Sequence, residues 1–503
     1  MSGGKTAIVI GAGAGGIATA LFLARNGYKV DVFEKNPLPG GRCGQIVRDG
    51  HRFDLGATMY LTPGMYNMAF ESLGINLAEG AEISPLDNLY RIFFDNGEEL
   101  AFTTDRERMR SQLEIIDAGS YKKSEEFVDK GYKIYLEGLE KLIGRNFFNL
   151  FQLVNFKNIG LLIRLKVYIS NWKYTGKFFR NHNLQMAYTF QNIYVGQSPF
   201  NSPALFSMIP AAELTEGSYF LKGGMYAIIE KLHSAALSHG VIFHFDTPAA
   251  RINIKDKKAE SITLEDGQEI KADIFVANAD LPYVYRKLLP DRRKSAHIDR
   301  LKYSCSVICF HWAMDKPYPQ LDHHNVFISD SLKGGLDRIF RDKVIDDNPT
   351  FYIHAPSRSD SDAAPYGQDT LSVAVGAGHL DPSKNQDWDM LKDKAREAVI
   401  RRLEKYGLED FKKHIKFEIC YTPDDWERYC NVSRGSVFGS LSHNILQMGY
   451  FRPHNRHDKY HNLYFAGSST HPGNGIPNVL LSARLTGERI ILEHNSKTEL
   501  KNK

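Results

Sequence analysis

The feature that most constrains the fold of this chain is a glycine motif that follows a short apolar run near its start. Thr6–Ile10 is typical of a buried strand, and Gly11, Gly13 and Gly16 follow it as G-x-G-x-x-G at the start of a helical pattern. Gly11 allows a tight turn, Gly13 lets a pyrophosphate approach the backbone, and Gly16 lets helix and strand pack closely. Because the helix would offer free N–H groups to phosphate, the pattern predicts a dinucleotide-binding unit.

A second apolar run, Tyr28–Phe33, ends on Glu34, whose carboxylate can accept hydrogen bonds from ribose hydroxyls. An acidic side chain there disfavours a 2′-phosphate and therefore NADP. The motif alone does not separate NAD from FAD, and a glycine-rich turn in another α/β unit is the alternative. The cofactor-contacting residues expected here are Gly11, Ala12, Gly13, Ala14, Gly15, Gly16, Glu34 and Lys35.

Composition limits the class of protein. The length of 503 residues suggests two or three domains, and the charged content of 24% suits a globular chain. Net charge is only +4, which argues against a nucleic-acid binder. The five cysteines lack zinc-type spacing, so we expect reduced thiols in a cytoplasmic protein. We see no signal peptide and no apolar run long enough to span a bilayer.

Three further segments separate FAD from NAD. "PLPGGRCGQ" follows the second strand, and its Gly40-Gly41-Arg42 resembles the second glycine motif of FAD-dependent amine oxidases and carotenoid desaturases. "HRFDLGATMY" resembles the loop of that superfamily that lies under the isoalloxazine ring. Residues 240–280 resemble the part where the chain returns to complete the FAD domain, with a hairpin at Asp266-Gly267. The resemblance implies cofactor contacts from Gly41, Arg42, Gly56, Ala57, Thr58, Met59, Ala249 and Asn278.

The C-terminal segment "HNLYFAGSSTHPGNGIPNVLLSARLTGERI" (461–490) contains a short apolar strand, a glycine-rich loop and a helix from about Ile476. The helix would point its N-terminal amides at the flavin, where negative charge develops on reduction. "GSSTHPGNGIPNVLLSARLTGE" is similar to the signature of bacterial phytoene-desaturase-type carotenoid oxidoreductases. The resemblance places Gly467, Ser468, Gly475, Ile476, Pro477 and Asn478 at the cofactor.

The resemblance covers essentially the whole chain and implies an FAD-dependent carotenoid desaturase, with the hydroxycarotenoid 3,4-desaturases as the most similar branch. Asn474 and Asn478 depart from the small residues usual in the family, which bears on substrate specificity. Related alternatives are a carotenoid isomerase, a retinol-saturase-like enzyme, or an amine or protoporphyrinogen oxidase. A non-enzymatic lipid-binding escort protein on the same fold is disfavoured, because such proteins lack an intact phosphate motif.

Six segments have strand character and predict an antiparallel sheet above the flavin in an α+β substrate domain. They are "LYRIFFDNGEELAF", "SCSVICFHWAMD", "HNVFIS", "TFYIHAPS", "TLSVAVGA" and "FEICYT". One face of such a sheet can line an apolar tunnel for a polyene. "SHNILQMGYFRPHNR" (442–456) is interpreted as a polar loop, and no metal site is expected.

The segment 141–180 has eight Lys or Arg residues and no Asp or Glu, and the acid-free run continues to Glu213. Aromatic and aliphatic side chains alternate there with basic ones, as in a helix lying in the plane of a membrane. Anionic headgroups attract each basic residue by about 1 kcal/mol. We therefore expect a helical lid that rests on the cytoplasmic membrane and opens the tunnel to it. The apolar members are Phe147, Phe148, Phe151, Phe156, Leu161, Leu162, Tyr168 and Trp172, and the basic ones are Lys157, Arg164, Lys166, Lys173 and Lys177. A plain amphipathic helix with a basic solvent face is the alternative.

The predicted fold class is a discontinuous α/β Rossmann-like FAD domain, an α+β antiparallel-sheet substrate domain and a helical lid. The predicted boundaries are 1–75, 215–290 and 445–495 for the FAD domain, 76–105, 181–214 and 291–444 for the substrate domain, 106–180 for the lid and 496–503 for a polar tail. The expected partners are a carotenoid, the lipid bilayer surface, and a quinone or O₂ as electron acceptor.

The expected reaction transfers a hydride from a C–H bond beside a polyene to flavin N5, after which a proton leaves to complete the double bond. The conjugated chain itself spreads the positive charge. Glu213 and Glu216 could lie near the cavity, although surface carboxylates are the more common case. No catalytic residue is assigned from the sequence.

Overall fold

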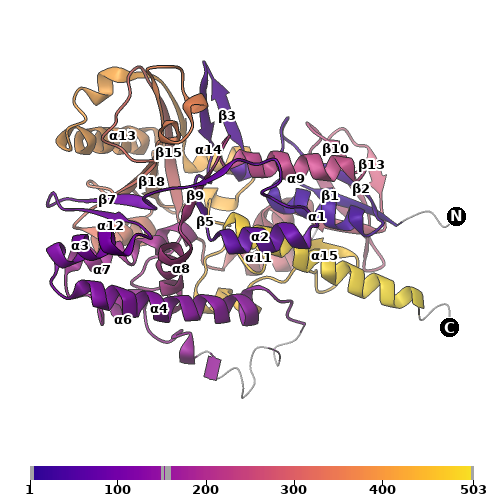
Figure 1. Cartoon of the computed structure of the whole chain (residues 1–503). Coiled ribbons are helices and arrows are strands. Elements are labelled where there is room, and N and C mark those ends of the chain that lie inside the picture. Colours follow the sequence, from indigo (N-terminus) through magenta and orange to yellow (C-terminus); the bar gives the residue numbers. More distant parts are fainter. Residues whose placement is uncertain (1–4, 149–151, 153–159, 162, 290, 500–503) are drawn as a thin grey trace.

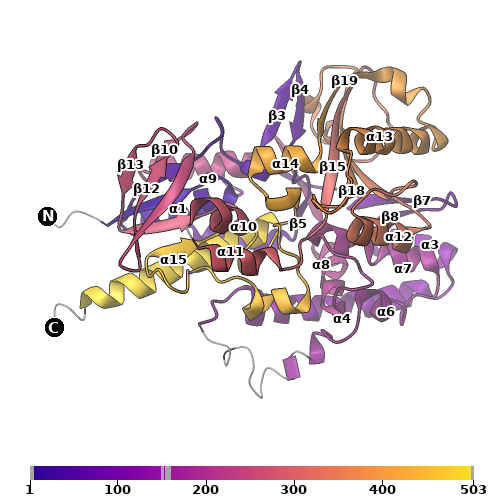
Figure 2. The same ribbon diagram turned by 180° about the vertical axis from the view of Figure 1, so that it is seen from behind.

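The computed structural model describes residues 5–148, 152, 160–161, 163–289 and 291–499. Two lobes lie side by side, one around a parallel sheet and one around a larger mixed sheet (Figure 1). Figure 2 shows α14 (Pro423–Cys430) between the two lobes. Within the described ranges, no helix combines the length and the apolar character that crossing a bilayer requires.

Five strands form the parallel sheet, in the order β10-β2-β1-β14-β20, and every neighbouring pair runs parallel. Their bounds are β1 (Thr6–Ile10), β2 (Lys29–Phe33), β10 (Ile242–His244), β14 (Ile274–Ala277) and β20 (Leu463–Phe465). The strands thus come from three segments that are far apart in the sequence. A discontinuous α/β domain of this kind was predicted from those segments.

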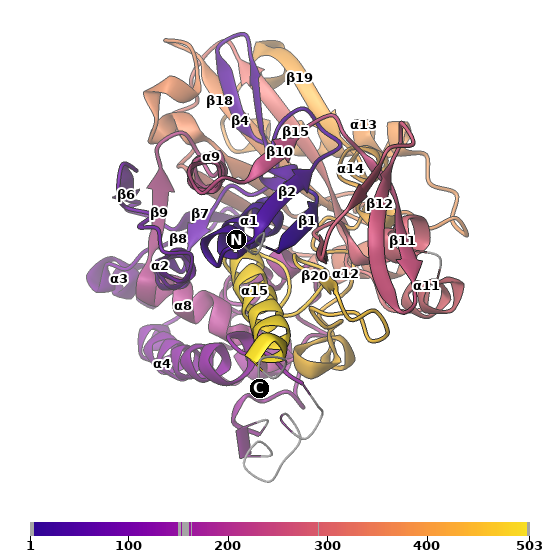
Figure 3. The ribbon, with the colours of Figure 1, turned by 90° about the vertical axis from the view of Figure 1, so that its right-hand side faces the viewer.

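Both faces of this sheet are covered, as expected for parallel strands. In β1, Ala7 and Val9 pack into the core under the helices, and Ile8 and Ile10 pack into the core of the opposite face. Figure 3 shows the helices and a small antiparallel sheet on opposite sides of β1 and β2. The helices are α1 (Ala14–Arg25), α2 (Pro63–Ser72), α9 (Tyr226–Ser238) and α15 (Ile476–Glu499), and the small sheet is β11 (Ala249–Lys255), β12 (Lys258–Leu264) and β13 (Glu269–Lys271). α15 continues to Glu499, so residues 496–499, which belong to the predicted polar tail, are helical.

The second lobe contains a seven-stranded sheet in the order β19-β15-β18-β17-β16-β7-β8. The strands are β7 (Tyr90–Phe94), β8 (Glu99–Phe102), β15 (Ser306–Met314), β16 (His324–Ile328), β17 (Phe351–His354), β18 (Asp369–Ala377) and β19 (Ile415–Tyr421). All six predicted strand segments are confirmed, but the sheet is mixed rather than purely antiparallel, because β16 pairs with β7 in parallel. The long chain excursion between these two strands permits a parallel crossover.

Strand alternation gives this sheet one packed face and one open face. In β15, Ile308, Phe310 and Trp312 are fully buried in the core under α13 (Trp388–Lys405), while Cys309 and His311 line a cavity. Smaller elements complete the molecule: β3 (Gln45–Arg48), β4 (His51–Asp54), β5 (Tyr60–Leu61), β6 (Ile83–Pro85), β9 (Ser218–Leu221), α10 (Leu281–Tyr283), α11 (Arg292–Asp299) and α12 (Leu332–Asp337).

A helical layer covers the rest of the cavity. Its members are α3 (Arg106–Ile116), α4 (Ser120–Gly138), α6 (Asn171–Thr175), α7 (His182–Ala187) and α8 (Met208–Glu216). α4 crosses close to α8 at Gly131, where an added Cβ would lie 2.5 Å from the Cβ of Ala211. Much of the predicted lid is therefore helical. Phe151, Phe156, Lys157 and Leu162 lie outside the described residues.

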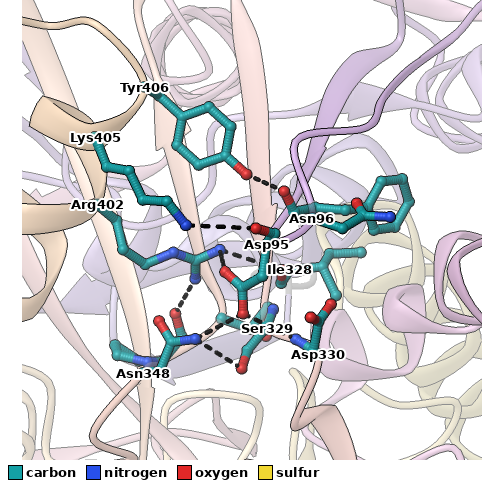
Figure 4. Close-up of polar contacts among 12 residues, drawn as sticks. Asp95, Asn96, Ile328, Ser329, Asp330, Asn348, Arg402, Lys405 and Tyr406 are labelled. Atoms are coloured by element: carbon teal, nitrogen blue, oxygen red, sulfur yellow. Dashed lines mark hydrogen bonds and ion pairs between the residues drawn. The ribbon is translucent and has the colours of Figure 1, made fainter.

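A buried ion pair fastens α13 to the ends of the sheet strands (Figure 4). Arg402 pairs with Asp95 at 2.7 Å and donates to the carbonyls of Pro349 and Ile328 at 2.7 and 3.1 Å. The second carboxylate oxygen of Asp95 accepts from Asn348 at 2.6 Å. Since these groups satisfy one another, the cluster fixes the positions of β7, β16 and β17.

Candidate functional site

A single continuous cavity of about 1060 Å³ extends between the two lobes. Glu34, at the end of β2, and Gly475, before α15, both line it, although 441 positions separate them in the sequence. Of the 22 residues predicted to contact a cofactor, 20 line this cavity. They are Gly11, Gly13, Ala14, Gly15, Glu34, Lys35, Gly41, Arg42, Gly56, Ala57, Thr58, Met59, Ala249, Asn278, Gly467, Ser468, Gly475, Ile476, Pro477 and Asn478.

The other two predicted residues, Ala12 and Gly16, support the cavity wall from behind. The backbone N–H of Ala12 donates to Glu34 Oε2 at 2.7 Å. A Cβ on Gly16 would lie 2.0 Å from the carbonyl oxygen of Gly11, so only glycine allows this approach of helix and strand. Both residues shape the turn, and their direct contact with a cofactor stays a prediction.

The glycine turn forms a cradle with free donors. Gly11 has φ +100°, a conformation that glycine adopts without strain. A Cβ on Gly15 would lie 2.6 Å from Asn278 Oδ1, so there is no room for a side chain here and the backbone itself faces the cavity. α1 begins after Gly13 without a side-chain cap and without an acidic residue in its first turn. Its first N–H groups therefore fit an anionic pyrophosphate.

Glu34 and Lys35 mark the end of the cavity beside the glycine turn. Glu34 is only 7% exposed, and its two carboxylate oxygens accept from the backbone N–H groups of Ala12 and Asn36. The remaining lone pairs can accept from ribose hydroxyls. Lys35 instead directs its ammonium to the carbonyl of Arg428 at 2.7 Å, which ties this end to α14.

Arg42 connects separated parts of the wall. Its guanidinium donates to the carbonyl of Val437 at 2.6 Å and to the hydroxyl of Ser468. Gly40 and Gly41, with φ +119° and +56°, let the chain turn beside Gly13 to reach this position. The second and the C-terminal glycine segments are thus held together by one side chain.

The rest of the cavity is a chamber with an apolar wall. It is bounded by the open face of the seven-stranded sheet and by α8, and its wall contains aliphatic and aromatic side chains from distant segments. These include Leu142, Ile143, Val167, Phe190, Ile193, Leu205, Phe206, Ile209, Val326 and Ile339. Such a wall suits a long hydrocarbon, since about 0.8 kcal/mol is gained for each CH₂ transferred from water.

From the sequence, Glu213 could lie near the cavity or, as is more common for a carboxylate, on the surface. In the structure it lies in the chamber wall. Its side chain is fully buried, Oε2 accepts from the hydroxyl of Tyr90 at 2.8 Å, and Oε1 has no partner among the described residues. Desolvation raises the pKa of Glu213 from 4.5 to about 8, and the Tyr90 hydrogen bond opposes that rise. Glu213 lies on the cavity face of α8 with Ile209. Glu216, which is half-buried, does not line the cavity and accepts from Tyr132.

The five cysteines are free thiols. Burial raises the pKa of Cys305 and of Cys309 to about 12 and that of Cys43 further still, so none of these three is an activated thiolate. His323, His324 and His354 form a buried cluster that was not predicted from the sequence, where no metal site was expected. Only the cross-strand register brings His354 beside His324, and nothing in the local sequence shows that pairing.

Comparison with known proteins places these features in a family. The family model of flavin-containing amine oxidoreductases matches residues 14–491. The chain is 38% identical to a phytoene desaturase of Phycomyces blakesleeanus, covering 97% of this chain and 85% of that protein. It is 37% identical to a zeta-carotene-forming phytoene desaturase of Myxococcus xanthus, covering 97% and 94%. An oxidoreductase structure from Methanosarcina mazei shares the fold, with a TM-score of 0.60 at 17% identity over 96% of this chain and 100% of that one.

Proposed function

The chain belongs to the flavin-containing amine oxidoreductases and, within them, to the phytoene-desaturase-type carotenoid oxidoreductases, and from this premise we propose that it introduces C=C bonds into a long polyene. Its cofactor is FAD. The observation that carries the proposal is the single cavity that joins a dinucleotide cradle to an apolar chamber. A protein that only sequestered lipid would not need the phosphate-binding end.

The residues present fit FAD. The bare turn at Gly13 and the uncapped start of α1 would hold the pyrophosphate, and Glu34 would hold the ribose. Gly475, Ile476 and Asn478 at the start of α15 would lie at the ring, as expected for this family. When bound, FAD supplies the hydride acceptor for the oxidation of a C–C bond.

The protein must then remove a proton, and Glu213 is the group placed to accept it. It lines the apolar chamber, and its Oε1 is free of protein partners among the described residues. A carboxylate with a pKa of about 8 is matched to proton transfer near neutral pH. Tyr90 orients Oε2 through its hydroxyl and is itself held by an N–H···O bond from Gln191 at 2.8 Å. Oε1 therefore accepts the proton while Oε2 stays hydrogen-bonded.

We further propose that the substrate enters from the cytoplasmic membrane, where the protein is peripherally associated. Ile445, Leu446 and Phe451 line the cavity and yet are 46%, 71% and 48% exposed, so they mark its mouth. Part of the basic segment 141–180 lies beside that mouth, because Val167 and Met448 pack against the same apolar cluster and Tyr168 is 70% exposed. Exposed apolar residues beside basic ones favour an interfacial contact.

The proposal also includes the electron acceptor and the choice of carotenoid. A quinone dissolved in the membrane, or O₂, would reoxidise the cofactor. The chamber wall is mostly apolar but also contains buried polar groups, among them Glu213, Asp346 and His311, which is compatible with a pure hydrocarbon or with a hydroxycarotenoid undergoing 3,4-desaturation. The named relatives act on phytoene, which makes phytoene the first substrate to test.

The test is incubation of the FAD-loaded protein with liposomes that carry phytoene, a hydroxylated carotenoid or a retinoid, followed by product spectra. We expect the absorption of a carotenoid to move to longer wavelength as conjugation grows. An isomerase would change the absorption without loss of hydrogen, which mass spectrometry of the product distinguishes. No product from any carotenoid, with flavin bound and liposomes present, would falsify the proposed activity.

A further inference from the structure

The open face of the seven-stranded sheet ends in a row of polar side chains. The register places His324 opposite His354, and both His354 and His311 opposite Ser372. The next row along the same face, which includes Val326 and Ala374, lines the apolar chamber. His323 immediately precedes His324 in the sequence and adds a third imidazole to the His324–His354 pair. A cross-strand cluster of imidazoles therefore lies at the edge of the chamber.

The three imidazoles of His323, His324 and His354 are arranged as a ligand set. Each offers one nitrogen, and these nitrogens all lie within 4.8 Å of one another. The Nε2 atoms of His323 and His354 are 3.1 Å apart. For a tetrahedral ion with bonds of about 2.0–2.1 Å, ligand atoms are about 3.3 Å apart, so the His323–His354 pair is already at this spacing and the more widely spaced nitrogens would close by up to about 1.5 Å on binding.

The free nitrogens of the cluster point to a missing partner. The three residues are 6%, 1% and 1% exposed. His324 Nε2 and His354 Nδ1 have no hydrogen-bond partner in the part of the chain that the structure describes. A buried nitrogen without a hydrogen-bond partner destabilises the fold. The hydrogen bond between His323 Nε2 and His354 Nε2 does not involve either of these two nitrogens.

The outer nitrogens of His323 and His324 are held as they are in metal sites. His323 Nδ1 is 2.8 Å from the hydroxyl of Ser359, and His324 Nδ1 is 2.7 Å from the hydroxyl of Tyr352. Such contacts fix the tautomer and aim the opposite nitrogen.

We propose that His323, His324 and His354 bind one transition-metal ion of the zinc class, with three imidazole ligands and a fourth position for water. Imidazole sets of this kind suit Zn²⁺, Cu²⁺ and Co²⁺ better than Mg²⁺ or Ca²⁺. The site would also stiffen the chamber, because the Tyr352 hydroxyl that meets His324 is 2.9 Å from the Thr58 hydroxyl in the cofactor loop. Asp360 and Arg358 are the charged groups that face His323, and each is paired, with Arg52 and Asp369.

The experiment uses the FAD-loaded protein, stripped with a chelator and re-equilibrated with Zn²⁺, with bound metal counted by mass spectrometry after gel filtration. We expect a stoichiometric amount in the wild type and in His311→Gln, which alters the same row outside the ligand set. His354→Gln should lose it, and Tyr352→Phe should bind about 10-fold more weakly, since it keeps the ligands but loses an outer contact.

Wild-type protein that retains no zinc, or His354→Gln that retains as much as wild type, would overturn the proposal. If His354→Gln fails to retain FAD, the Co²⁺ complex of the wild type decides instead. Intense ligand-field absorption typical of tetrahedral cobalt supports the site, and the weak spectrum of the aqueous ion contradicts it. Because metal content is measured independently of turnover, this result is separate from that of the desaturase assay.

Discussion

Two buried ionisable side chains, Arg402 and Glu213, differ in how many of their polar atoms have hydrogen-bond partners. Arg402 is 5% exposed and meets a carboxylate and two carbonyls (Figure 4). Glu213 is fully buried too, but only one of its oxygens is bonded to the protein among the described residues. A cluster whose polar atoms all have hydrogen-bond partners holds strands in place. A side chain with an unpartnered oxygen leaves that atom available to a substrate.

The largest expected difference is in activity. Glu213→Gln keeps the shape of the side chain and removes its proton-accepting oxygen, so kcat should fall by about 10²–10⁴-fold. FAD content and thermal stability should be retained, and the rate of product formation is the readout. The neighbouring Glu216→Gln, outside the cavity wall, is the matched control. Equal rates for Glu213→Gln and wild type would remove Glu213 from the reaction.

Arg402 should show the opposite behaviour. Arg402→Met leaves Asp95 buried without its partner, and we expect the free energy of unfolding to fall by about 3–5 kcal/mol. Urea unfolding of the holoprotein measures this change. Arg401→Met, at an exposed position of the same helix, should change stability by less than about 0.5 kcal/mol. A similar small effect at both positions would mean that the buried cluster does not fasten the sheet.

At the mouth of the cavity, the effect should appear in membrane binding. Leu446→Ser removes an exposed apolar side chain from the mouth and should weaken binding to anionic vesicles by about 1.5–3 kcal/mol if Leu446 is buried in lipid. Co-sedimentation with vesicles measures the change. Met390→Ser, at an exposed apolar position on α13 that does not line the cavity, should bind as wild type does. Equal losses for both variants would contradict a localised contact.

The last expected effect concerns the pH dependence of stability, which is spread over several pH units and is therefore small at any one step of pH. The pKa of Glu213 is raised from 4.5 to about 8, so between these values the folded state holds a proton that the unfolded state releases. Stability from this group therefore falls as pH rises through that window, by up to about 1.4 kcal/mol per unit. Unfolding of wild type and Glu213→Gln from pH 5 to pH 8 should show a shallower decline in the variant. In the wild type, kcat should rise with pH through about 8 as the carboxylate forms.

Local patterns explain why much of the fold could be predicted. The turn at Gly11 and the strands of both lobes depend on glycine geometry and on alternation within a few residues, and these appear where they were expected. The parallel pairing of β7 with β16 was missed, because it depends on a distant crossover. The histidine cluster was missed for the same reason, and the sequence offered Glu213 only as one of two possibilities, since contacts with distant segments bury these side chains.

The end of α15 at Glu499 was difficult to predict from the sequence for a different reason. Its polar residues resemble a tail, yet they continue a helix that begins in the glycine-rich loop. The membrane contact and the roles of individual cofactor residues remain predictions, because the ligands that would reveal them are not part of the chain.

The central claim is that one cavity brings a polyene to the face of bound flavin. The most direct measurement mixes oxidised holoprotein with phytoene-containing vesicles in the absence of oxygen and quinone, and follows flavin and product absorption together. The account predicts that the flavin absorption bleaches at the rate at which the longer chromophore appears. Product without bleaching, or an unchanged flavin spectrum beside a bound polyene, would contradict it.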